Sequence, residues 1–512
     1  MPPPAPEDPA HWIERALRDY PQRLFLRTPH GSSLSYADLA QASAHYAAAL
    51  GALGVGAGER VLVRSARSPE LIILYVACLR LGALFVPVNP QGTAAELEHV
   101  LRDAQPALAV LAPGEHAALA PLAAACGART ATLGAGNEGT LPGSARAPGP
   151  RTVTARAHAP GDLAAIVYTS GTTGRPKGAM LTRGNLASNA AVLARAWRFT
   201  GEDLLLHVLP LYHVHGLFVA LNTTLAAGSG LLFCERFAAP AALAQLAQAS
   251  VFMGVPTHYT RLLAEPALDV RACQGMRLFV SGSAPLTAAT HEAFQARTGH
   301  SILERYGMTE TLMNTANPYD GPRVPGSVGC ALPGIRLRLA DRGADGVGVI
   351  EVQGPNVCAG YWGAAGGRAA DFGPGGWFRT GDLASIDAHG YVTLVGRTRD
   401  LIISGGLNVY PKEVELELDA LDGISESAVF GVAHPDFGEG VTAVVVSAPG
   451  AKLSEPQILA ALRTRLSDYK LPKRVLAIDE LPRNAMGKVR KEALRERYAQ
   501  LYARGGDDER AL

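Results

Sequence analysis

Short apolar runs alternate with longer helical stretches along most of the chain. Four runs rich in β-branched or other apolar residues cover 60–64, 108–111, 163–168 and 251–255, and alanine- and leucine-rich segments separate them. Runs of about four to eight such residues are typical of buried strands, and longer periodic segments are typical of helices. The alternation predicts an α/β protein with layered sheets of largely parallel strands.

The longest apolar run, 71–88, is interrupted by Arg80, Gly82 and Pro87. The segment 68–70 (Ser-Pro-Glu) ahead of it is typical of a helix start, with a capping serine and a proline in the first turn. Gly82 is typical of the residue that follows a helix end. The run therefore predicts a buried helix followed by a strand, and its charge and its two breakers argue against a membrane-spanning segment.

The pattern changes after residue 399. Short strands are predicted over 427–432, 441–447 and 475–478, and helices over 411–421 and from a capping box at Ser454 and Gln457 to about Leu466. These elements predict a small α+β domain, joined near Arg399 to the large α/β body. The segment 133–161 is rich in glycine, proline and alanine, which predicts a long surface loop.

Composition and charge narrow the class of protein. The chain has 512 residues, of which 48% are apolar and 18% charged, and its formal net charge is +1. The length and composition predict a globular enzyme of at least two domains. The small net charge predicts no strong electrostatic field that would attract nucleic acid or an anionic membrane. The six cysteines contain no CxxC pair, so neither a zinc site nor a disulfide framework is expected. The proline-rich start has the form of neither a signal nor a transit peptide, which predicts a cytoplasmic protein.

A glycine- and hydroxyl-rich loop follows the predicted strand 163–168. Glycine lets the backbone approach a phosphate, N–H groups and hydroxyls donate to it, and a lysine supplies positive charge. The loop is not a Walker A sequence, because no Gly-Lys-Ser/Thr closes a GxxxxGK[ST] pattern. The predicted phosphate-binding residues are Thr169, Ser170, Gly171, Thr172, Thr173, Gly174 and Lys177.

Five further motifs follow this loop. They are SGSAPL at 281–286, ERYGMTE at 304–310, FRTGD at 378–382, GRTRD at 396–400 and PRNAMGK at 482–488. In this order, the loop and the motifs resemble the adenylate-forming superfamily of acyl-CoA synthetases, luciferases and peptide-synthetase adenylation domains. The resemblance spans nearly the whole chain. It implies a large N-terminal domain (1–397) that binds ATP and the acyl group, a hinge (398–399) and a small mobile C-terminal α+β domain (400–512).

The resemblance assigns ATP to these motifs. Tyr306 offers a flat face on which adenine can stack, Asp382 can accept from the ribose hydroxyls, and Arg397 can neutralise the nucleotide. Thr309 can donate to the α-phosphate. Glu310, together with Thr172, is the candidate ligand of a Mg²⁺ ion that bridges phosphates. The other implied ATP-binding residues are Gly282, Ser283, Ala284, Pro285, Glu304, Arg305, Gly307 and Met308.

Lys488 lies in a short glycine-containing loop near the C-terminus. By the resemblance, it bridges the attacking carboxylate and the α-phosphate of ATP, where one well-aimed cation is worth on the order of 10²–10³ in rate. The carboxylate needs no general base, because it is an anion at neutral pH. In the superfamily the small domain then turns about the hinge, here at Arg399, and withdraws the lysine.

The same rotation forms a thiol tunnel in the superfamily. Ser404, Gly405 and Gly406 match its wall, where absent side chains leave room for pantetheine, and an ordinary turn is the alternative. His213 resembles a histidine that gates between the acyl and thiol channels, and a structural histidine is the alternative. ATP, Mg²⁺ and coenzyme A are therefore the expected small-molecule partners, and either a monomer or a dimer is possible.

Three segments, 210–216, 254–261 and 304–321, resemble malonyl-CoA synthetases in finer detail. Malonate carries a second carboxylate, which must be held by a buried cation or suffer a large desolvation penalty. Arg261 is the candidate clamp, with a surface arginine as the alternative reading and Arg236 as the second choice. The candidates to line a short acyl pocket are His207, His215 and Met313.

The predicted activity is ATP-dependent ligation of malonate to coenzyme A through malonyl-AMP. The same chemistry on methylmalonate, oxalate, or a short or aromatic monocarboxylate stays open, and so does the loading of a carrier protein. A nucleotide-binding protein without transfer activity would lack Lys488, the hinge or Glu310, and all three are present.

Overall fold

The computed structural model describes residues 7–145, 158–170, 176–363, 371–405, 407–451, 453–484 and 487–503. The chain divides into two compact units. The first consists of Met1–Leu337 and Val352–Phe378, and the second of Arg338–Glu351 and Arg379–Leu512. The predicted hinge at 398–399 falls within the second unit, and its role as a pivot stays a prediction.

One sheet of the first unit has six strands in the order β6-β5-β3-β4-β7-β8. Strands β3 to β7 pair in parallel, and β7 and β8 form an antiparallel hairpin. Apolar side chains of α4 and α5 pack on one face of this sheet. The elements are β3 (Arg60–Arg64), β4 (Leu84–Pro87), β5 (Leu108–Leu111), β6 (Arg129–Thr132), β7 (Leu163–Ser170), β8 (Pro176–Thr182), α4 (Ala94–Ala104) and α5 (His116–Ala125).

The other sheet of this unit has nine strands in the order β15-β14-β13-β12-β11-β9-β10-β1-β2. Its centre is parallel, and α9, α10 and α11 share a core with its strands. The strands are β1 (Leu24–Arg27), β2 (Ser33–Ser35), β9 (Leu204–His207), β10 (Gly230–Phe233), β11 (Val251–Gly254), β12 (Leu278–Ser281), β13 (Leu303–Met308), β14 (Leu312–Ala316) and β15 (Cys330–Ala331). The helices are α9 (Ala239–Leu246), α10 (Pro256–Leu263) and α11 (Ala288–Thr298).

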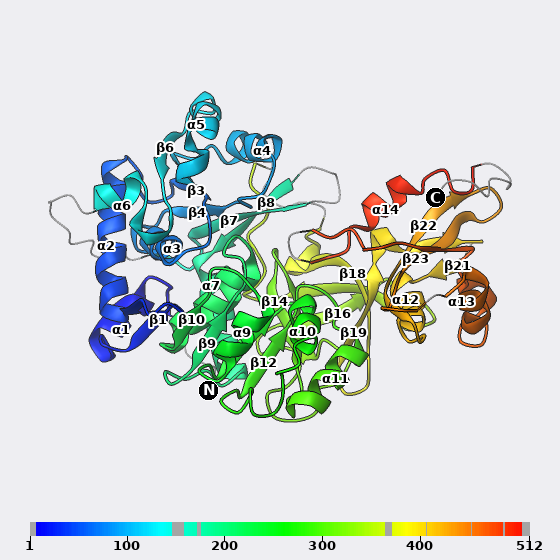
Figure 1. Cartoon of the computed structure of the whole chain (residues 1–512). Helices are drawn as coiled ribbons and strands as arrows, with labels where there is room; N and C mark the ends of the chain where they lie inside the picture. The colour runs from blue at the N-terminus through cyan, green and yellow to red at the C-terminus, as the bar shows by residue number, and fades with distance from the viewer. Residues whose placement is uncertain are drawn as a thin grey trace. The chain divides into compact units, whose positions relative to one another are not determined.

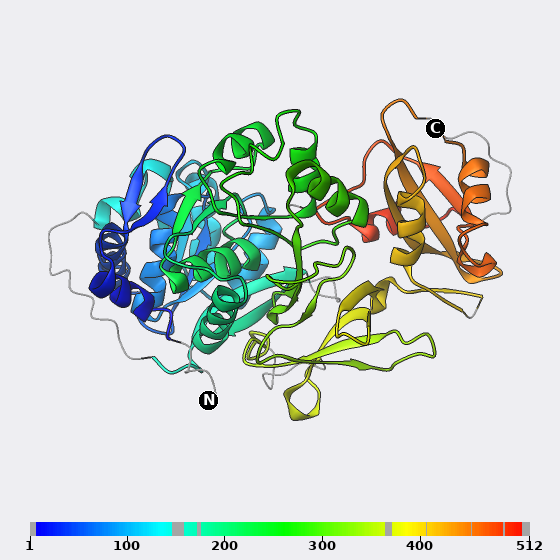
Figure 2. The same cartoon turned by 90° about the horizontal axis from the view of Figure 1, so that it is seen from below.

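Helix α7 (Arg183–Ala196) contacts strands of both sheets, β7 and β14, where the cyan and green parts of the unit meet in Figures 1 and 2. Beside it, Tyr75 of α3 (Pro69–Leu81) donates to Asn222 Oδ1 of α8 (Asn222–Ala227) at 3.0 Å. The predicted α/β layering is therefore confirmed. The first unit also contains the α-helices α1 (His11–Asp19), α2 (Tyr36–Ala52) and α6 (Thr140–Ala145) and the π-helix η3 (His215–Leu221).

The second unit contains a four-stranded sheet, β16-β17-β18-β19, and a five-stranded sheet built on the long hairpin of β22 and β23. Alternate residues of this hairpin face α12 and α13 on one side and α14 on the other. The strands are β16 (Arg336–Ala340), β17 (Gly348–Gln353), β18 (Phe378–Ile386), β19 (Val392–Arg397), β20 (Ile402–Ser404), β21 (Leu407–Val409), β22 (Ile424–His434), β23 (Gly438–Ser447) and β24 (Arg474–Ala477). The helices are α12 (Pro411–Asp419), α13 (Glu455–Leu462) and α14 (Lys491–Arg497).

Local signals in the sequence predicted several of these elements well. Ser68 Oγ accepts from the backbone N–H of Leu71 at 3.2 Å, and Gly82 ends α3 in a left-handed conformation at φ 78°. Two predictions were wrong. Helix α13 stops at Leu462, where the chain continues as turns, and the predicted loop 133–161 contains α6. Helix α6 forms because Leu141 is fully buried, which gives this otherwise small-residue segment an apolar anchor.

A buried ion pair ties the N-terminal segment to α7. Arg183 is 1% exposed, and its Nε and Nη2 donate to the carboxylate of Asp8 at 2.7 and 2.6 Å. Although burial alone raises the pKa of Asp8, the hydrogen bond and charge of Arg183 bring it below its ordinary value. The ionised pair is therefore favoured at neutral pH, and its contribution is lost as the pH falls through the lowered pKa.

Asp8→Asn is expected to lower the melting temperature by several degrees at pH 7, because an unpaired buried guanidinium costs about 3–5 kcal/mol. The matched control is Asp19→Asn, which breaks an exposed pair with Arg18 and is expected to leave the melting temperature unchanged. Thermal unfolding followed by circular dichroism measures both. Equal melting temperatures for the two variants would show that the buried pair does not stabilise the unit.

Candidate active site

The predicted phosphate loop leaves from the β7–β8 hairpin. Thr169 on β7 pairs with Lys177 on β8 in register, so the hydroxyl and the ammonium group stand on adjacent strands. The Lys177 Nζ lies 5.4 Å from the centroid of the Tyr361 ring. Gly171, Thr172, Thr173 and Gly174 lie outside the described residues, as does the side chain of Ser170. Their predicted roles, including that of Thr172 at the metal, stay predictions.

The carboxylate of Glu310 lies next to this hairpin. It is 6% exposed, and its Oε1 accepts from the hydroxyls of Thr169 at 3.3 Å and Tyr361 at 3.2 Å. Burial, and then the charge of Glu310, raise the pKa of Tyr361, so its hydroxyl stays a donor. One buried carboxylate flanked by hydroxyls is a set of hard oxygen ligands, which fits a Mg²⁺ ion that takes its other ligands from phosphates and water.

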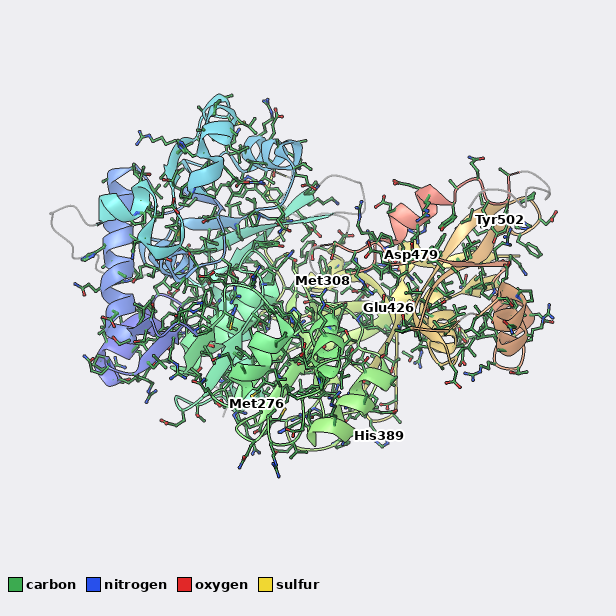
Figure 3. All side chains as sticks on the ribbon, in the orientation of Figure 1. Met276, Met308, His389, Glu426, Asp479 and Tyr502 are labelled. Carbon is green, nitrogen blue, oxygen red and sulfur yellow. The ribbon has the colours of Figure 1, made fainter. Side chains whose placement is uncertain are left out.

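The signature segment 304–310 forms β13 and the turn into β14. A side chain at Gly307 would place its Cβ 1.9 Å from the carbonyl oxygen of Leu312, so only glycine lets the two strands pair here. Tyr306 is buried, whereas Met308, labelled in Figure 3, and Thr309 are partly exposed at the end of the strand. Glu304 accepts from the backbone N–H of Leu286 at 3.0 Å. That bond ties the strand to the predicted adenine-side loop, whose Ala284 is partly exposed and Pro285 exposed.

Arg305 is a buried cation in the same strand. It is 3% exposed, and burial lowers its pKa to about 9, so it remains charged at neutral pH. Among the residues that the structure describes, its Nε and Nη2 have no hydrogen-bond partner. The guanidinium packs against Gly282, where a Cβ would lie 2.4 Å from Cζ. Gly282 thus makes room for an arginine whose protonated form is favoured by the neighbouring Tyr259 and Glu304, but whose Nε and Nη2 find no acceptor in the described part of the chain.

His215 adds a second buried polar group beside that loop. Its Nδ1 lies 3.1 Å from the hydroxyl of Ser283, the residue after Gly282. Its Nε2 is buried without a partner in the described structure. Burial, and then the positive charge of Arg305, hold the pKa of His215 well below its ordinary value, so the ring is neutral. When Ser283 donates to Nδ1, the hydrogen of the ring resides on Nε2, which is then a free donor.

His207 occupies both of its ring nitrogens. Its Nε2 lies 2.9 Å from the carbonyl oxygen of Gly216, which can only accept, so Nε2 carries the hydrogen. Its Nδ1 then accepts from Nη2 of Arg67 at 2.6 Å. Burial, and then the charge of Arg67, lower the pKa of His207 to about 3. A role for His207 in supporting the start of the π-helix fits these contacts better than direct contact with an acyl group.

The remaining predicted residues of this region are Met313, the arginines Arg261 and Arg236, and the gating candidate His213. Met313 is 2% exposed and its methyl group lies over Gly307, as a residue that limits pocket depth would. Arg261, on α10, and Arg236 are both exposed, which favours the surface reading of each. His213 is partly exposed beside Tyr212, with ring centroids 4.3 Å apart, and burial lowers its pKa to about 4. Its proposed gating role stays a prediction.

The second unit contains three of the predicted nucleotide-binding residues, Asp382, Arg397 and Lys488. Asp382 on β18 is buried and pairs with Nε of Arg397 on β19 at 2.8 Å. Lys488 lies in a turn in which its N–H donates to Asn484 Oδ1 at 3.0 Å. The turn is held by Arg483, whose Nη2 donates to Glu426 at 2.7 Å (labelled in Figure 3).

The pKa of Lys488 is shifted by its burial and by the charged residues near it. Burial first, and then repulsion by Arg397, lower its pKa to about 8, while the charge of Asp382 opposes the shift. Arg397 and Asp382 are thus close enough to influence the ammonium group. A pKa of about 8 makes the ammonium form responsive to pH near neutrality, and the role of Lys488 in adenylation stays a prediction.

The predicted hinge and thiol residues follow β19. Arg399 is exposed in a short 3-10 helix, Thr398–Asp400. Ser404 is buried at the end of β20, and Gly405 turns the chain at φ 58° while its N–H donates to the carbonyl oxygen of Phe437 at 2.9 Å. Gly406 lies outside the described residues. These contacts explain the turn, and the pantetheine role stays a prediction.

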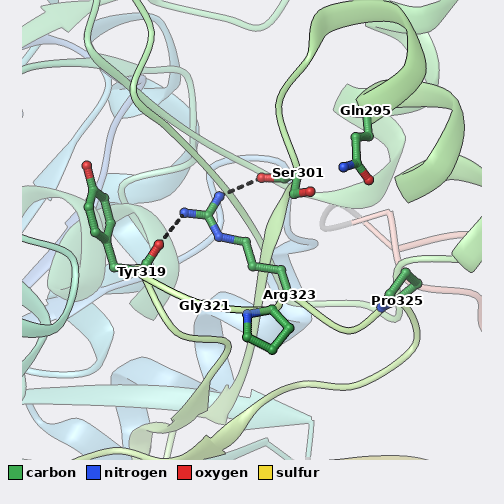
Figure 4. A pocket seen from close by; sticks show the side chains of 7 residues that line it. Gln295, Ser301, Tyr319, Gly321, Arg323 and Pro325 are labelled. Carbon is green, nitrogen blue, oxygen red and sulfur yellow. Dashed lines mark hydrogen bonds between the residues drawn. The ribbon is translucent and has the colours of Figure 1, made fainter.

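A surface pocket of about 450 Å³ lies apart from these residues. Arg323 at its centre donates from Nη1 to the carbonyl oxygen of Ser301 at 2.6 Å and from Nη2 to that of Tyr319 at 3.1 Å (Figure 4). Its Nε donates to a third carbonyl, that of Pro318. Arg323 therefore orders the loop around it, and the pocket contains none of the predicted site residues. The lining residues are Gln295, Ser301, Tyr319, Gly321, Pro322, Arg323 and Pro325.

Comparison with known families decides the classification. The AMP-binding enzyme family matches residues 13–362, and the C-terminal domain of AMP-binding enzymes matches residues 413–488. The chain belongs to the AMP-binding enzyme family. The resemblance to the adenylate-forming superfamily and the expected large N-terminal and small C-terminal parts are therefore confirmed.

Individual relatives of this AMP-binding enzyme cover most of its length. A feruloyl-CoA synthase from Amycolatopsis sp is 35% identical over 501 residues, which are 94% of this chain and 99% of that protein. The mitochondrial malonate–CoA ligase of Mus musculus is 35% identical over 490 residues, with 87% and 82% covered. The crystal structure of ATP-bound MatB from Rhodopseudomonas palustris is 47% identical with a TM-score of 0.93, covering 97% of this chain and 100% of that chain.

Two residues that contact the site were not among the predicted ones. Tyr361 donates to Glu310, and Arg67 fixes the tautomer of His207. Neither belongs to an ordered motif, and both reach the site through tertiary packing that local sequence does not reveal.

Among the described residues, no helix combines the length and the apolar character needed to cross a bilayer.

Proposed function

We propose that this AMP-binding enzyme is an AMP-forming acid–CoA ligase whose preferred acid is malonate. In the first step a carboxylate oxygen bonds to the α-phosphorus of ATP and pyrophosphate leaves, which gives malonyl-AMP. In the second step the thiolate of coenzyme A attacks the acyl carbonyl and AMP leaves, which gives malonyl-CoA. Relatives named as CoA synthase and malonate–CoA ligase, matched over most of their length, support this chemistry.

Two groups of residues are proposed to bind the nucleotide. In the first unit, Thr169 and Lys177 flank the phosphate loop, and Glu310 would hold Mg²⁺, which when bound would neutralise phosphate charge. In the second unit, Asp382 would accept from the ribose hydroxyls beside Arg397, and the Lys488 ammonium would stabilise charge on the α-phosphate oxygens. Tyr306 and the loop 282–285 would border the adenine.

The observation that carries the choice of malonate is the buried pair of Arg305 and His215. Both adjoin the Gly282–Ser283 segment, and both present donor atoms without a partner among the described residues. Buried donors without acceptors are costly, and a bound carboxylate would accept hydrogen bonds from both groups. Malonate offers such a carboxylate at its far end. Arg305 therefore replaces Arg261 as the proposed clamp.

The dimensions of the acid follow from the neighbours of Arg305. Gly307 lies two residues beyond Arg305 on β13. The buried Met313 lies opposite Gly307 on β14. Met313 fills the space over Gly307, so a long acyl chain would have to displace a packed side chain. A short diacid suits this arrangement. Methylmalonate adds one methyl group and is expected to be rejected by about 10–200-fold at most.

For the second step, Ser404, Gly405 and Gly406 remain the proposed wall of the pantetheine channel, and Arg399 the proposed pivot. His213 would stand between the acyl and thiol sites as a neutral ring, since its pKa is lowered to about 4. A neutral ring neither repels nor traps the thiolate electrostatically. These assignments extend the superfamily resemblance and are separable from the choice of acid.

Aromatic monocarboxylates are the second candidate substrates. The observation that favours them is the 35% identity to a feruloyl-CoA synthase over 94% of this chain. An aromatic acid would leave the Nε and Nη2 donors of Arg305 without an acceptor, which is why malonate is preferred.

Thioester formation with ATP, Mg²⁺ and coenzyme A is the test. The acids are malonate, methylmalonate, succinate, acetate, ferulate and a medium-chain fatty acid, each at several concentrations, with AMP release as the second readout. Malonate is expected to have the highest kcat/KM, by about 10³–10⁴-fold over acetate, because only a diacid satisfies Arg305. A higher value for ferulate or acetate would retain the ligase chemistry and reject malonate. The absence of AMP release with every acid would count against the ligase itself.

A further inference from the structure

We infer that helix α4 is a positioning element for the phosphate-binding hairpin, acting through His99 and Asp103. The inference rests on the proposed function, because it assumes that the loop between β7 and β8 binds ATP. The two side chains are four residues apart and so lie on the same face of α4. His99 contacts β8 and Asp103 contacts β7. Each contact is next to a predicted phosphate-binding residue.

His99 holds the start of β8. Its Nε2 lies 2.9 Å from the carbonyl oxygen of Pro176, so Nε2 carries the hydrogen and donates. Pro176 is the first residue of β8 and directly precedes Lys177. The strand β8 is also last in the order of its sheet, so one side of it lacks a full strand partner. The hydrogen bond from α4 therefore restrains the backbone that carries Lys177.

Asp103 holds the end of β7. The hydroxyl of Tyr168 donates to Asp103 Oδ2, and Tyr168 directly precedes Thr169. Burial, and then the neighbouring Asp103, raise the pKa of Tyr168, so the phenol keeps its proton and remains the donor. The next hydroxyl along the strand, that of Thr169, donates to Glu310 at 3.3 Å. Asp103 thus fixes the strand that carries a donor to the proposed Mg²⁺ ligand.

The two contacts act on one rigid piece of backbone. Tyr168 pairs with Gly178 in register, and a Cβ at Gly178 would lie 3.0 Å from Cζ of the Tyr168 ring. The indole N–H of Trp362 donates to the backbone carbonyl of Asp103 at 3.0 Å, and the backbone N–H of Trp362 donates to the carbonyl of Gly178 at 2.8 Å. Trp362 therefore joins α4 to the hairpin a third time. The restraint passes from α4 into both strands.

Such a restraint matters because the side chains it positions are the ones proposed to meet phosphate. A displacement of about 1 Å in a group that binds the reacting atoms can cost about 10²-fold in rate. If His99 and Asp103 were only satisfied polar groups on a helix face, their loss would affect stability alone. A positioning role predicts an effect on ATP in particular.

The test compares His99→Ala, His99→Gln and Tyr168→Phe with the unchanged protein in two assays. The first is malonate-dependent exchange of pyrophosphate into ATP, which reports the adenylation step and the KM for ATP. The second is thioester formation from synthetic malonyl-AMP and coenzyme A, which does not use the phosphate loop. Arg102→Ala is the matched control, since Arg102 is exposed on the same helix and pairs with Glu98.

His99→Ala and Tyr168→Phe are each expected to raise the KM for ATP by about 3–10-fold, the range of one hydrogen bond of about 0.5–1.5 kcal/mol. Thioester formation from malonyl-AMP should be unchanged in both. His99→Gln retains a donor at the end of a side chain of similar length and is expected to restore the KM for ATP. Arg102→Ala should match the unchanged protein.

An unaltered KM for ATP in His99→Ala and Tyr168→Phe would overturn the inference. Equal losses of rate in pyrophosphate exchange and in thioester formation would also overturn it, and so would a KM for ATP in His99→Gln that stays as high as in His99→Ala. A wild-type protein that exchanges pyrophosphate, with variants that behave identically to it, rejects the positioning role and leaves the proposed function intact. A wild-type protein that exchanges no pyrophosphate with any acid rejects the proposed function itself.

Discussion

Lys488→Ala is expected to slow acyl-AMP formation by about 10²–10³-fold, because it removes the cation proposed to stabilise charge on the α-phosphate oxygens. Thioester formation from synthetic malonyl-AMP should stay within about twofold, because the proposed rotation about the hinge withdraws Lys488 before that step. Pyrophosphate exchange measures the first step, and release of AMP from malonyl-AMP in the presence of coenzyme A measures the second. The contrast between the two steps is what identifies the role.

The matched control is Lys412→Ala. Lys412 belongs to the same unit, is partly buried and lies 4.0 Å from Glu415, so its removal tests the general effect of losing a lysine. It should leave both steps unchanged. Equal losses in both steps for Lys488→Ala would indicate a damaged fold and would contradict an assignment to adenylation.

The same group sets an expected pH dependence. The pKa of Lys488 is lowered to about 8, chiefly by burial and then by Arg397. The active form is the charged one, so kcat/KM for ATP should fall as the pH rises through about 8, well below the ordinary lysine pKa of about 10.4. Lys488→Arg keeps its charge throughout this range, and its profile should show no decline near pH 8. A decline at the same pH in Lys488→Arg would assign the titration to another group.

Ordered motifs predicted which polar side chains the fold would bring together, because the chemistry of each motif is local. The loop beginning at Thr169, the carboxylate of Glu310 and the pair of Asp382 and Arg397 each combine residue types that bind phosphate, metal or ribose, and the structure brings Thr169 to Glu310 and Asp382 to Arg397. Caps and glycines predicted element boundaries for the same reason. Their roles in binding ATP remain proposals, tested by the exchange assays above.

The burial of an arginine such as Arg305 is harder to predict because it depends on tertiary register. Arg261 followed a predicted strand, but Tyr259 and Leu262 are the buried residues of α10, which leaves Arg261 off the packed face. Arg305 is internal because Ser281 pairs with Glu304 between neighbouring parallel strands. That register places Gly282, which directly follows β12, beside Arg305 of β13. No local pattern in either segment specifies which strands become neighbours.

Arg305→Met is expected to lower kcat/KM for malonate by about 10³–10⁴-fold while changing that for acetate or propionate little. A site built around a partner for a substrate carboxylate discriminates by about this amount, and methionine fills similar volume without charge or donors. Thioester formation across the acid panel measures the change. Arg261→Ala is the matched control, and its exposure predicts unchanged selectivity.

Thermal stability gives an independent readout of the same substitution. In the protein without substrate, Arg305 is a buried charge whose Nε and Nη2 lack partners among the described residues. Malonate should therefore raise the melting temperature of the unchanged protein but not that of Arg305→Met.

A variant that loses malonate activity and retains acetate activity cannot have lost activity through unfolding. A loss of activity toward malonate and acetate alike would place Arg305 with the nucleotide instead. Selective loss in Arg261→Ala would return the clamp to the exposed arginine.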